Sequence, residues 1–361
     1  MKFGKNVDFF GKRVKILIES RGVIMAKGNK EQIISYILKL VSAKDEMLVK
    51  KTVEAFEVSK STVYNYIKEL CDNGILQKDG AFYVIVSQNQ FFLYDNTTAL
   101  DESRIFEKDI APIFRGLEKN VFSIWRYAFT EMMNNAIEHS SSNEIIVVVF
   151  TNPLESTIMI ADNGIGIFKN IQAYMKAEHN RELPLDECAS LLFAGKFTTA
   201  KSMHSGEGIF FTSHLMDSFF IFSDDVIFSR NNFNDTQVKS IEKRDSTTVC
   251  MSLSNHTKKT TKEVFDRFSN VDEGFIKTQI PIAHIFPYGD PVSRSEGRRL
   301  GELILKFKEV DLDFAGVGEV GQAFCHELFV VWQGRNPNIT LNVLNAEEDV
   351  SNMIKRVINT K

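Results

Sequence analysis

The strongest restriction on the fold lies in residues 121–140, where one amphipathic helix is expected. Apolar side chains recur along one side at helical spacing, at Phe129, Met132, Met133, Ala136 and Ile137. A second side carries two acids, an amide and an imidazole: Glu131, Asn135, Glu138 and His139. A surface helix would use Lys and Arg as freely as Glu, so this side is either a solvated surface or part of a binding site.

Two apolar, β-branched runs follow this helix, at 144–150 and 156–162, and they predict adjacent strands. The second run ends in the turn DNGIGI, which places the Asp162 carboxylate where it can face a ligand at the strand end. Gly164 and Gly166 lack β-carbons, so a flat ring or a phosphate can approach the backbone there. A single DxGxG also occurs in ordinary turns, so the motif is weak on its own.

A glycine-rich loop, SGEGIFF, places Gly206 and Gly208 immediately before a helix expected at 209–217. Free N–H groups and the positive end of the helix dipole can bind phosphate at such a position. The loop is neither a Walker A sequence nor a dinucleotide-binding fingerprint. Three later runs predict strands and complete an α+β segment whose sheet leans towards antiparallel pairing: 218–223, 225–229 and 247–253.

In this order, the stretches EMMNNAIEH, DNGIGI and HSGEGIFF resemble the N box and the two glycine boxes of the GHKL superfamily of ATPases. That superfamily includes gyrase B, MutL, the histidine kinases and the anti-sigma-factor serine kinases. The resemblance extends from the polar helix to the last of the predicted strands. It implies an α/β sandwich, the Bergerat fold, that binds ATP together with Mg²⁺.

The resemblance implies a role for each matching position. Asn135 would hold Mg²⁺ against the triphosphate, which suits a cation that prefers oxygen ligands. Glu131 would polarise the attacking water or hydroxyl, and Asp162 would accept a hydrogen bond from the adenine amino group. The remaining nucleotide-binding positions are Gly164 and Gly166 beside the adenine, Gly206 and Gly208 around the phosphates, and Thr247 (with Thr248 as the alternative) supporting Asp162.

A long irregular stretch is expected between the two glycine boxes, and residues 191–204 would form the ATP lid. Lys196 and Lys201 are candidates to reach the γ-phosphate, although lid lysines are as often merely solvated. Histidine kinases often lack an acid at the position of Glu131, so its presence favours hydrolysis or transfer to a hydroxyl. We expect Glu207, between the last two glycines, to point outward, because its carboxylate would repel phosphate.

Residues 31–86 predict three helices, at 31–41, 49–58 and 59–74, followed by a hairpin around Asp79-Gly80. Ser59 is a good N-cap and Gly74 a good helix stop. This order resembles a winged helix-turn-helix, which implies that the third helix enters the major groove of DNA. The residues expected to face the DNA are Lys60, Ser61, Thr62, Tyr64, Asn65 and Lys68.

Charge is unevenly distributed along the chain, which carries a net charge of −4. Residues 31–86 carry seven Lys against eight Asp or Glu, a net of −1, whereas residues 1–30 carry eight Lys or Arg against two acids, or +6. Because phosphate contacts dominate DNA affinity, only the basic leading segment supplies an electrostatic footprint. A winged helix used for protein contacts or dimerisation, behind a solvated basic arm, is the alternative.

Residues 275–361 alternate between strand and helix patterns, which indicates a small open sheet with helices packed on it. The order, with LDFAGVGEVGQAF, resembles the STAS domain of anti-anti-sigma factors. In those proteins a GHKL kinase phosphorylates a serine in the turn that matches 320–324, where this chain has no Ser or Thr. The resemblance therefore implies docking on the ATPase in cis or on a second copy, and a homodimer is left open.

Composition excludes several classes of protein. No run of about 20 apolar residues occurs, so no membrane association is expected. The four cysteines form no CxxC pair, which argues against a zinc site or a disulfide framework. A reduced, cytoplasmic protein with three domains is expected: 1–95, 100–256 and 275–361.

The sequence as a whole predicts an ATP-dependent switch in transcriptional regulation. Mg-ATP, bound and slowly hydrolysed in the middle domain, would set the arrangement of a DNA-binding winged helix and a STAS-like domain that contacts a protein partner. Two alternatives stay open. One is a serine/threonine protein kinase of the anti-sigma type acting on a separate partner, and the other is a non-enzymatic scaffold that binds ATP.

Overall fold

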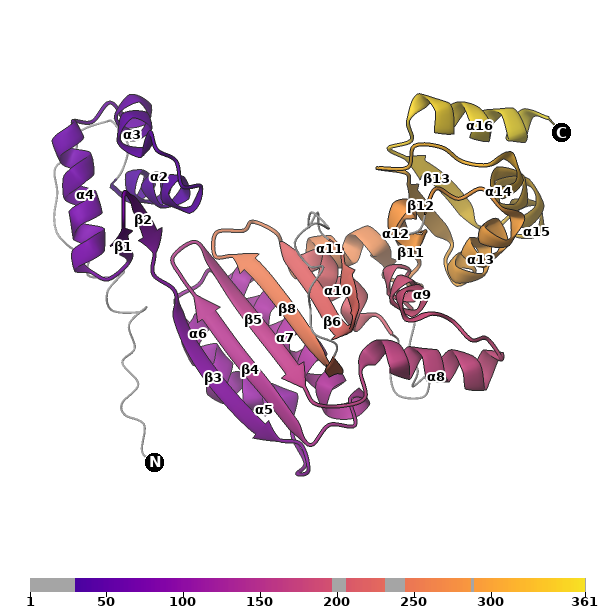
Figure 1. The fold of residues 1–361 in the computed structure, drawn as a ribbon, viewed down its shortest axis with the longest axis horizontal. Helices are drawn as coiled ribbons and strands as arrows, with labels where there is room; N and C mark the ends of the chain where they lie inside the picture. Colours follow the sequence, from indigo (N-terminus) through magenta and orange to yellow (C-terminus); the bar gives the residue numbers. More distant parts are fainter. Residues whose placement is uncertain (1–29, 197–205, 231–243, 287–288, 361) are drawn as a thin grey trace.

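The computed structural model describes residues 30–196, 206–230, 244–286 and 289–360. These residues form an α+β protein that contains both antiparallel and parallel sheets (Figure 1). A helical unit and a small three-stranded sheet lie at opposite ends of a central six-stranded sheet (Figure 1).

The helical unit contains three helices and one hairpin, in the predicted order. Its elements are α2 (Lys30–Ser42), α3 (Leu48–Phe56), α4 (Lys60–Asp72), β1 (Leu76–Asp79) and β2 (Phe82–Ile85). Ser59 caps α4 as predicted, because its hydroxyl accepts the backbone N–H of Thr62. The unit has its own hydrophobic core, in which Ile37 and Val63 are completely buried.

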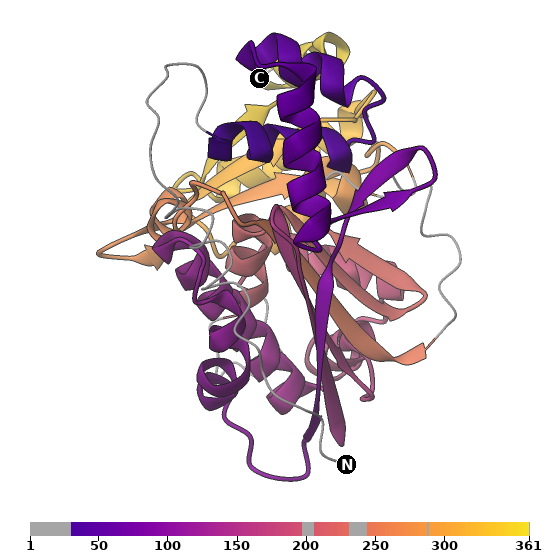
Figure 2. The same ribbon diagram turned by 90° about the vertical axis from the view of Figure 1, so that its left-hand side faces the viewer.

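Six strands form the central sheet in the order β3-β4-β5-β8-β6-β7, and every neighbouring pair is antiparallel. The strands are β3 (Gln88–Asp95), β4 (Glu144–Thr151), β5 (Glu155–Asp162), β6 (Ser218–Asp224), β7 (Val226–Ser229) and β8 (Arg244–Ser254). Alternate residues of β4 and β5 are buried, because helices cover one face of the sheet (Figure 2). The edge strand β3 lies inside the range expected for the first domain, so this sheet begins earlier in the chain than residue 100.

Helix α7 (Lys119–His139) packs on β5 and on α10 (Gly208–Leu215). It corresponds to the amphipathic helix predicted at 121–140, and its apolar side is buried as expected. Three short elements precede it: α5 (Glu102–Ile105), the π-helical turn η1 (Phe106–Ile110) and α6 (Ala111–Phe114). These residues do not form one continuous α-helix. Pro112 contributes to the break, because it lacks the N–H that an unbroken α-helix would use.

The largest departure from the sequence prediction lies between Gly166 and Gly206. The stretch was expected to be irregular, whereas it contains α8 (Ile167–His179), α9 (Leu185–Ser190) and the 3-10 turn η2 (Leu191–Phe193). The first turn of α8 is capped by a residue far away in the sequence. The Thr247 hydroxyl on β8 accepts the backbone N–H of Ile167, in place of a local side-chain cap. The predicted lid therefore begins with a helical turn, and its later part, including Lys201, lies outside the described residues.

The C-terminal unit alternates between strand and helix and forms the small open sheet predicted from the sequence. Parallel strands β11 (Lys277–Pro281), β12 (Glu309–Asp313) and β13 (Thr340–Leu344) make up the sheet, with β12 in the centre. Its helices are α12 (Ile282–Ile285), α13 (Arg294–Ile304), α14 (Gln322–Cys325), the π-helical η4 (His326–Trp332), α15 (Gln333–Arg335) and α16 (Glu348–Asn359).

Helix α11 (Thr261–Phe268) and the paired strands β9 (Ser269–Asn270) and β10 (Gly274–Phe275) join the central sheet to the C-terminal unit. One hydrophobic core runs through both, from Ile105 to Val357, separate from the core of the helical unit. Within the described ranges, no helix is long and apolar enough to cross a membrane.

Candidate functional site

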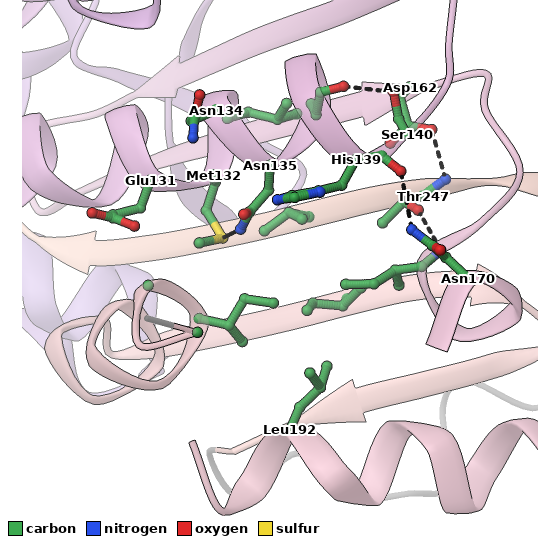
Figure 3. Close-up of a pocket in the computed structure, with 18 of the residues that line it drawn as sticks. Glu131, Met132, Asn134, Asn135, His139, Ser140, Asp162, Asn170, Leu192 and Thr247 are labelled. Atoms are coloured by element: carbon green, nitrogen blue, oxygen red, sulfur yellow. Dashed lines mark hydrogen bonds between the residues drawn. The ribbon is translucent and has the colours of Figure 1, made fainter. Parts of the chain in front are cut away.

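A cavity of about 330 Å³ lies between α7 and the central sheet, and α8 and the start of α10 complete its walls. The structure brings six of the predicted nucleotide-binding residues to this cavity: Glu131, Asn135, Asp162, Gly206, Gly208 and Thr247. Glu131 and Asp162 lie at opposite ends of it, and Leu192 faces it from the side opposite α7 (Figure 3). Segments far apart in the sequence thus meet at one site.

Asp162 is the last residue of β5 and is only 9% exposed. Its Oδ1 atom accepts backbone N–H groups from Gly164 at 2.9 Å and from Thr247 at 3.4 Å. Burial raises the pKa of this carboxyl, and the two N–H donors partly offset the increase. Both hydrogen bonds that the described structure gives the carboxylate use Oδ1, so Oδ2 is left to accept from a ligand.

Thr247 links Asp162 to the start of α8. Its backbone N–H donates to Asp162, while its hydroxyl accepts the N–H of Ile167 at 3.0 Å. Of the two threonines considered from the sequence, Thr247 is the one that lines the cavity. Asn170 on α8 closes the same end, and its side-chain amide donates to the His139 carbonyl at 3.3 Å.

The other end of the cavity combines two side chains of α7 with the loop before α10. Glu131 and Asn135 lie one helical turn apart, and a β-carbon on Gly208 would overlap the Glu131 carboxylate. The half-buried Asn135 amide makes one weak contact among the described residues, from Nδ2 to the Met132 sulfur at 4.0 Å. Its oxygen makes no hydrogen bond among the described residues, so it is available to a ligand.

Apolar side chains line the cavity between its two polar ends. They come from β5, α8, β6 and β8: Ile160, Ile167, Ile171, Ile221 and Val249. The site therefore has two polar ends, and between them the apolar side chains of the sheet and α8 lie across from Asn135 and His139 on α7 (Figure 3).

Glu207 is among the residues that line the cavity, and the outward direction predicted for its carboxylate stays a prediction. Burial is the main cause of the raised pKa of Tyr127, and the negative charges of Glu131 and Glu207 add to it. Both carboxylates therefore lie close enough to Tyr127 to act on the same hydroxyl. Two negative charges at one end of the cavity would repel phosphate. A phosphate group bound there would need a cation beside it.

Gly164 and Gly166 do not line the cavity, although both were predicted to contact the ligand. The protein itself requires them: a β-carbon on Gly164 would overlap the Ser140 carbonyl, and one on Gly166 would lie 2.7 Å from the Ser223 hydroxyl. Gly166 also has a φ of 86°, which favours glycine. These two glycines seat the turn after β5 and so shape the site indirectly.

Lys196, predicted to reach the phosphates, does not line the cavity. Its ammonium donates to the Lys306 carbonyl at 3.3 Å and lies over the rings of Phe275 and Phe307. Partial burial lowers the pKa of this ammonium. The structure thus pairs the predicted lid lysine with the C-terminal unit.

The residues predicted to face DNA lie on the outer side of α4. Five of them are exposed: Lys60, Ser61, Tyr64, Asn65 and Lys68. Thr62 is half-buried, because its backbone N–H and hydroxyl both bond to Ser59 at the helix start. The five exposed side chains leave this side of α4 open to solvent, and DNA binding there stays a prediction.

Sequence reasoning missed Asn170 and Ile171, which line the cavity from α8, because no helix was predicted after Gly166. Leu192, which lines it from η2, lies within the predicted lid but was given no role. One local signal was available: Phe168, Ile171 and Met175 are buried and recur at helical spacing.

A search of curated proteins finds no match to this chain. A family model does match residues 296–351, which extend from α13 into α16. That family is described as a STAS-like domain of unknown function (DUF4325), so the comparison confirms the STAS-like character predicted for the C-terminal unit.

Proposed function

We propose that this protein is a Mg-ATP-binding regulatory switch of the GHKL type, in which the nucleotide in the cavity controls a DNA-binding helical unit. One observation carries the proposal, namely the order of chemistry along the cavity. A buried carboxylate is followed by a middle with apolar walls on the sheet and α8, and then by an amide, carboxylates and a helix start. Adenosine triphosphate with Mg²⁺ has the matching order of amino-bearing ring, sugar and charged phosphates.

The Asp162 end suits an adenine ring. Oδ2 of Asp162 can accept a hydrogen bond from an exocyclic amino group, while Ile160 and Val249 offer apolar surface to the ring. In the same placement, guanine would bring a carbonyl oxygen to the carboxylate, and neither group could donate to the other. The site should therefore prefer ATP to GTP.

The opposite end suits a triphosphate held with Mg²⁺. Helix α10 begins at Gly208, and its first N–H groups and dipole favour an anion. Asn135 supplies an amide oxygen to the cation, while Glu131 and Glu207 place negative charge beside the phosphates. Mg²⁺ prefers such oxygen donors, keeps several of its waters and would relieve the repulsion between carboxylates and phosphates.

Isothermal titration calorimetry with Mg-ATP, with Mg-GTP and with ATP in EDTA tests the binding proposal. We expect Mg-ATP to bind at least about tenfold more tightly than either alternative, because each lacks a favourable interaction worth about 1.4 kcal/mol. If none of the three binds, the cavity is not a nucleotide site.

Glu131 is the residue that we propose to polarise an attacking water. It lies against Gly208 at the start of α10, beside the proposed phosphate position. Glu131→Gln should leave Mg-ATP affinity largely intact and lower phosphate release by about 10²- to 10⁴-fold, the usual contribution of a general base. Steady-state phosphate release, compared with a calorimetric titration of the same variant, checks this.

The same measurements separate the alternatives. Equal background rates in the wild type and in Glu131→Gln would favour a scaffold that binds ATP without turnover. Label transferred from radioactive ATP to a serine or threonine of another protein would favour a protein kinase.

We propose DNA binding by the helical unit on the exposed face of α4. Three helices followed by a hairpin, with polar side chains turned outward on the third helix, have the arrangement of a winged helix-turn-helix. Binding to random duplex should weaken steeply as salt increases, because phosphate contacts dominate such affinity. No binding at low salt would show that the unit serves protein contacts instead.

A further inference from the structure

Residues 190–196 connect the cavity to the C-terminal unit. Leu192 lines the cavity, while its neighbours in the chain contact C-terminal elements. The Ser190 hydroxyl donates to the Asp186 carbonyl at 3.0 Å and also lies 3.3 Å from the His284 carbonyl. The Phe193 ring stacks on the His284 ring with centroids 5.2 Å apart. The wall opposite α7 is therefore attached to α12 rather than to the central sheet alone.

Thr278 on β11 makes a fully buried contact with this wall. Its hydroxyl donates to the Ala194 carbonyl at 2.7 Å, and the residue is 0% exposed. Ala194 lies two residues after Leu192, directly beyond η2. Leaving a buried carbonyl without a strong donor is costly, so this hydrogen bond restricts where the wall can lie.

The end of the same segment is also held by the C-terminal unit. Gly195 has a φ of 74°, and a β-carbon there would lie 2.8 Å from the Phe275 ring, so its backbone lies against that ring. Lys196 and Lys306 donate to each other's carbonyls, at 3.3 and 3.0 Å. These contacts and the Thr278 hydrogen bond reach the segment from one unit.

We propose that Thr278 is a positioning residue of the cavity, which acts through Ala194 to place Leu192 and so lets the C-terminal unit set the affinity for nucleotide. The inference rests on the proposed function, because it concerns the same cavity. Coupling between two sites is reciprocal, so bound nucleotide must also favour one placement of the C-terminal unit. A protein that binds the STAS-like domain and shifts β11 would thereby change nucleotide affinity.

Thr278→Val tests the proposal, because valine has a similar shape but no hydroxyl donor. Thr52→Val is a matched control: Thr52 is also 0% exposed and donates to a backbone carbonyl, that of Leu48, at 2.7 Å, but in the helical unit. Thr278→Ser restores the hydroxyl. Each variant is measured by calorimetric titration with Mg-ATP, by thermal melting, and by hydrogen exchange of residues 191–196 without nucleotide.

We expect Thr278→Val to weaken Mg-ATP binding by about three- to tenfold and to speed exchange at 191–196. Thr278→Ser should keep both quantities close to wild type. Thr52→Val should lower the melting temperature without changing either, which separates positioning from a general loss of stability.

Unchanged affinity and exchange in Thr278→Val, or equal effects in Thr52→Val, would overturn the inference. If Thr278→Val does not fold, Lys306→Met removes the exposed hydrogen bond to the Lys196 carbonyl and should weaken Mg-ATP in the same direction. If the wild type binds no Mg-ATP, the proposed function fails, whereas the exchange data still decide whether Thr278 holds this segment.

Discussion

Asp162 serves the fold and a candidate ligand with different oxygen atoms. Oδ1 is committed to the backbone of Gly164 and Thr247, which fixes the turn after β5, while Oδ2 is left towards the cavity. Burial raises the pKa of the carboxyl, so the ionised form that would recognise a ligand is disfavoured in the free protein. A hydrogen-bond donor on the ligand would replace the water that the carboxylate loses on burial, so the ionised carboxylate is more stable when the site is occupied.

Asp162→Asn is expected to stabilise the free protein and to weaken Mg-ATP binding at least about tenfold. The asparagine keeps an oxygen for the two N–H donors but presents an amide donor to the ligand's amino group. Because the folded pKa is raised, the contribution of Asp162 to stability is fully present below the ordinary value of 3.8 and is lost as the pH rises through the folded pKa.

Melting curves of the wild type and of Asp162→Asn across pH check the direction of this stability difference. The variant should melt at a higher temperature near neutral pH, and the difference should disappear as the pH falls towards 3.8. A variant that is less stable than the wild type at neutral pH would show that burial is not what dominates the environment of Asp162.

At the scale of elements, the turn between β5 and α8 depends on a close backbone approach. A β-carbon on Gly164 would overlap the Ser140 carbonyl, which is main chain at the end of α7 and cannot rotate away. Gly164→Ala should therefore destabilise the protein by about 3 kcal/mol, the upper part of the usual range for overpacking. Urea unfolding measures this loss.

Gly74→Ala is the matched comparison for this turn. Gly74 has a φ of 68° but no heavy atom within 4 Å of an added β-carbon, so only backbone strain is introduced. A left-handed residue costs about 1–2 kcal/mol. Equal losses in the two variants would contradict the close approach as the cause.

The exposed face of α4 gives a second test at this scale. If Lys60 neutralises one phosphate, Lys60→Gln should reduce the slope of log affinity against log salt by about 0.9 and weaken binding to all sequences alike. Lys50→Gln on α3 is the control, because Lys50 is also exposed but lies beside Glu54 on another helix. If both variants give the same slope, Lys60 does not contact DNA phosphate.

At the scale of the whole molecule, the described chain has two hydrophobic cores. One belongs to the helical unit, and the other is shared by the central sheet and the C-terminal unit. This arrangement attaches the STAS-like domain to the cavity more firmly than it attaches α4. In the proposed switch, a change at the cavity would reach the C-terminal unit through packed side chains and the helical unit through the chain between β2 and β3.

Ile37→Ala should unfold the helical unit before the rest. The side chain is completely buried in the smaller core, and such truncations cost about 2–5 kcal/mol. Hydrogen exchange followed by mass spectrometry should show lost protection in residues 30–85, with the central sheet unchanged. Ile280→Ala, in the shared core, should show the opposite distribution, and a uniform loss in both variants would mean a single cooperative unit.

Local patterns were sufficient for much of the fold and for part of the candidate site. The Ser59 cap, the hairpin at Asp79-Gly80 and the strands that end at Thr151 and Asp162 follow from signals within a few residues. The spacing of Glu131 and Asn135 on one side of α7 is equally local. Helix α8 was missed because its first N–H is capped by Thr247, eighty residues later in the chain.

The sequence alone determined most of the elements, because helical spacing, strand alternation and capping act over a few neighbouring residues, and the resemblance to GHKL ATPases indicated which residues could meet at a cavity. Only the tertiary structure decided that Glu207 lines the cavity, that Lys196 pairs with Lys306, and that Thr278 holds the wall at Ala194. Burial and hydrogen bonding at these positions depend on segments that become neighbours only when the chain is folded.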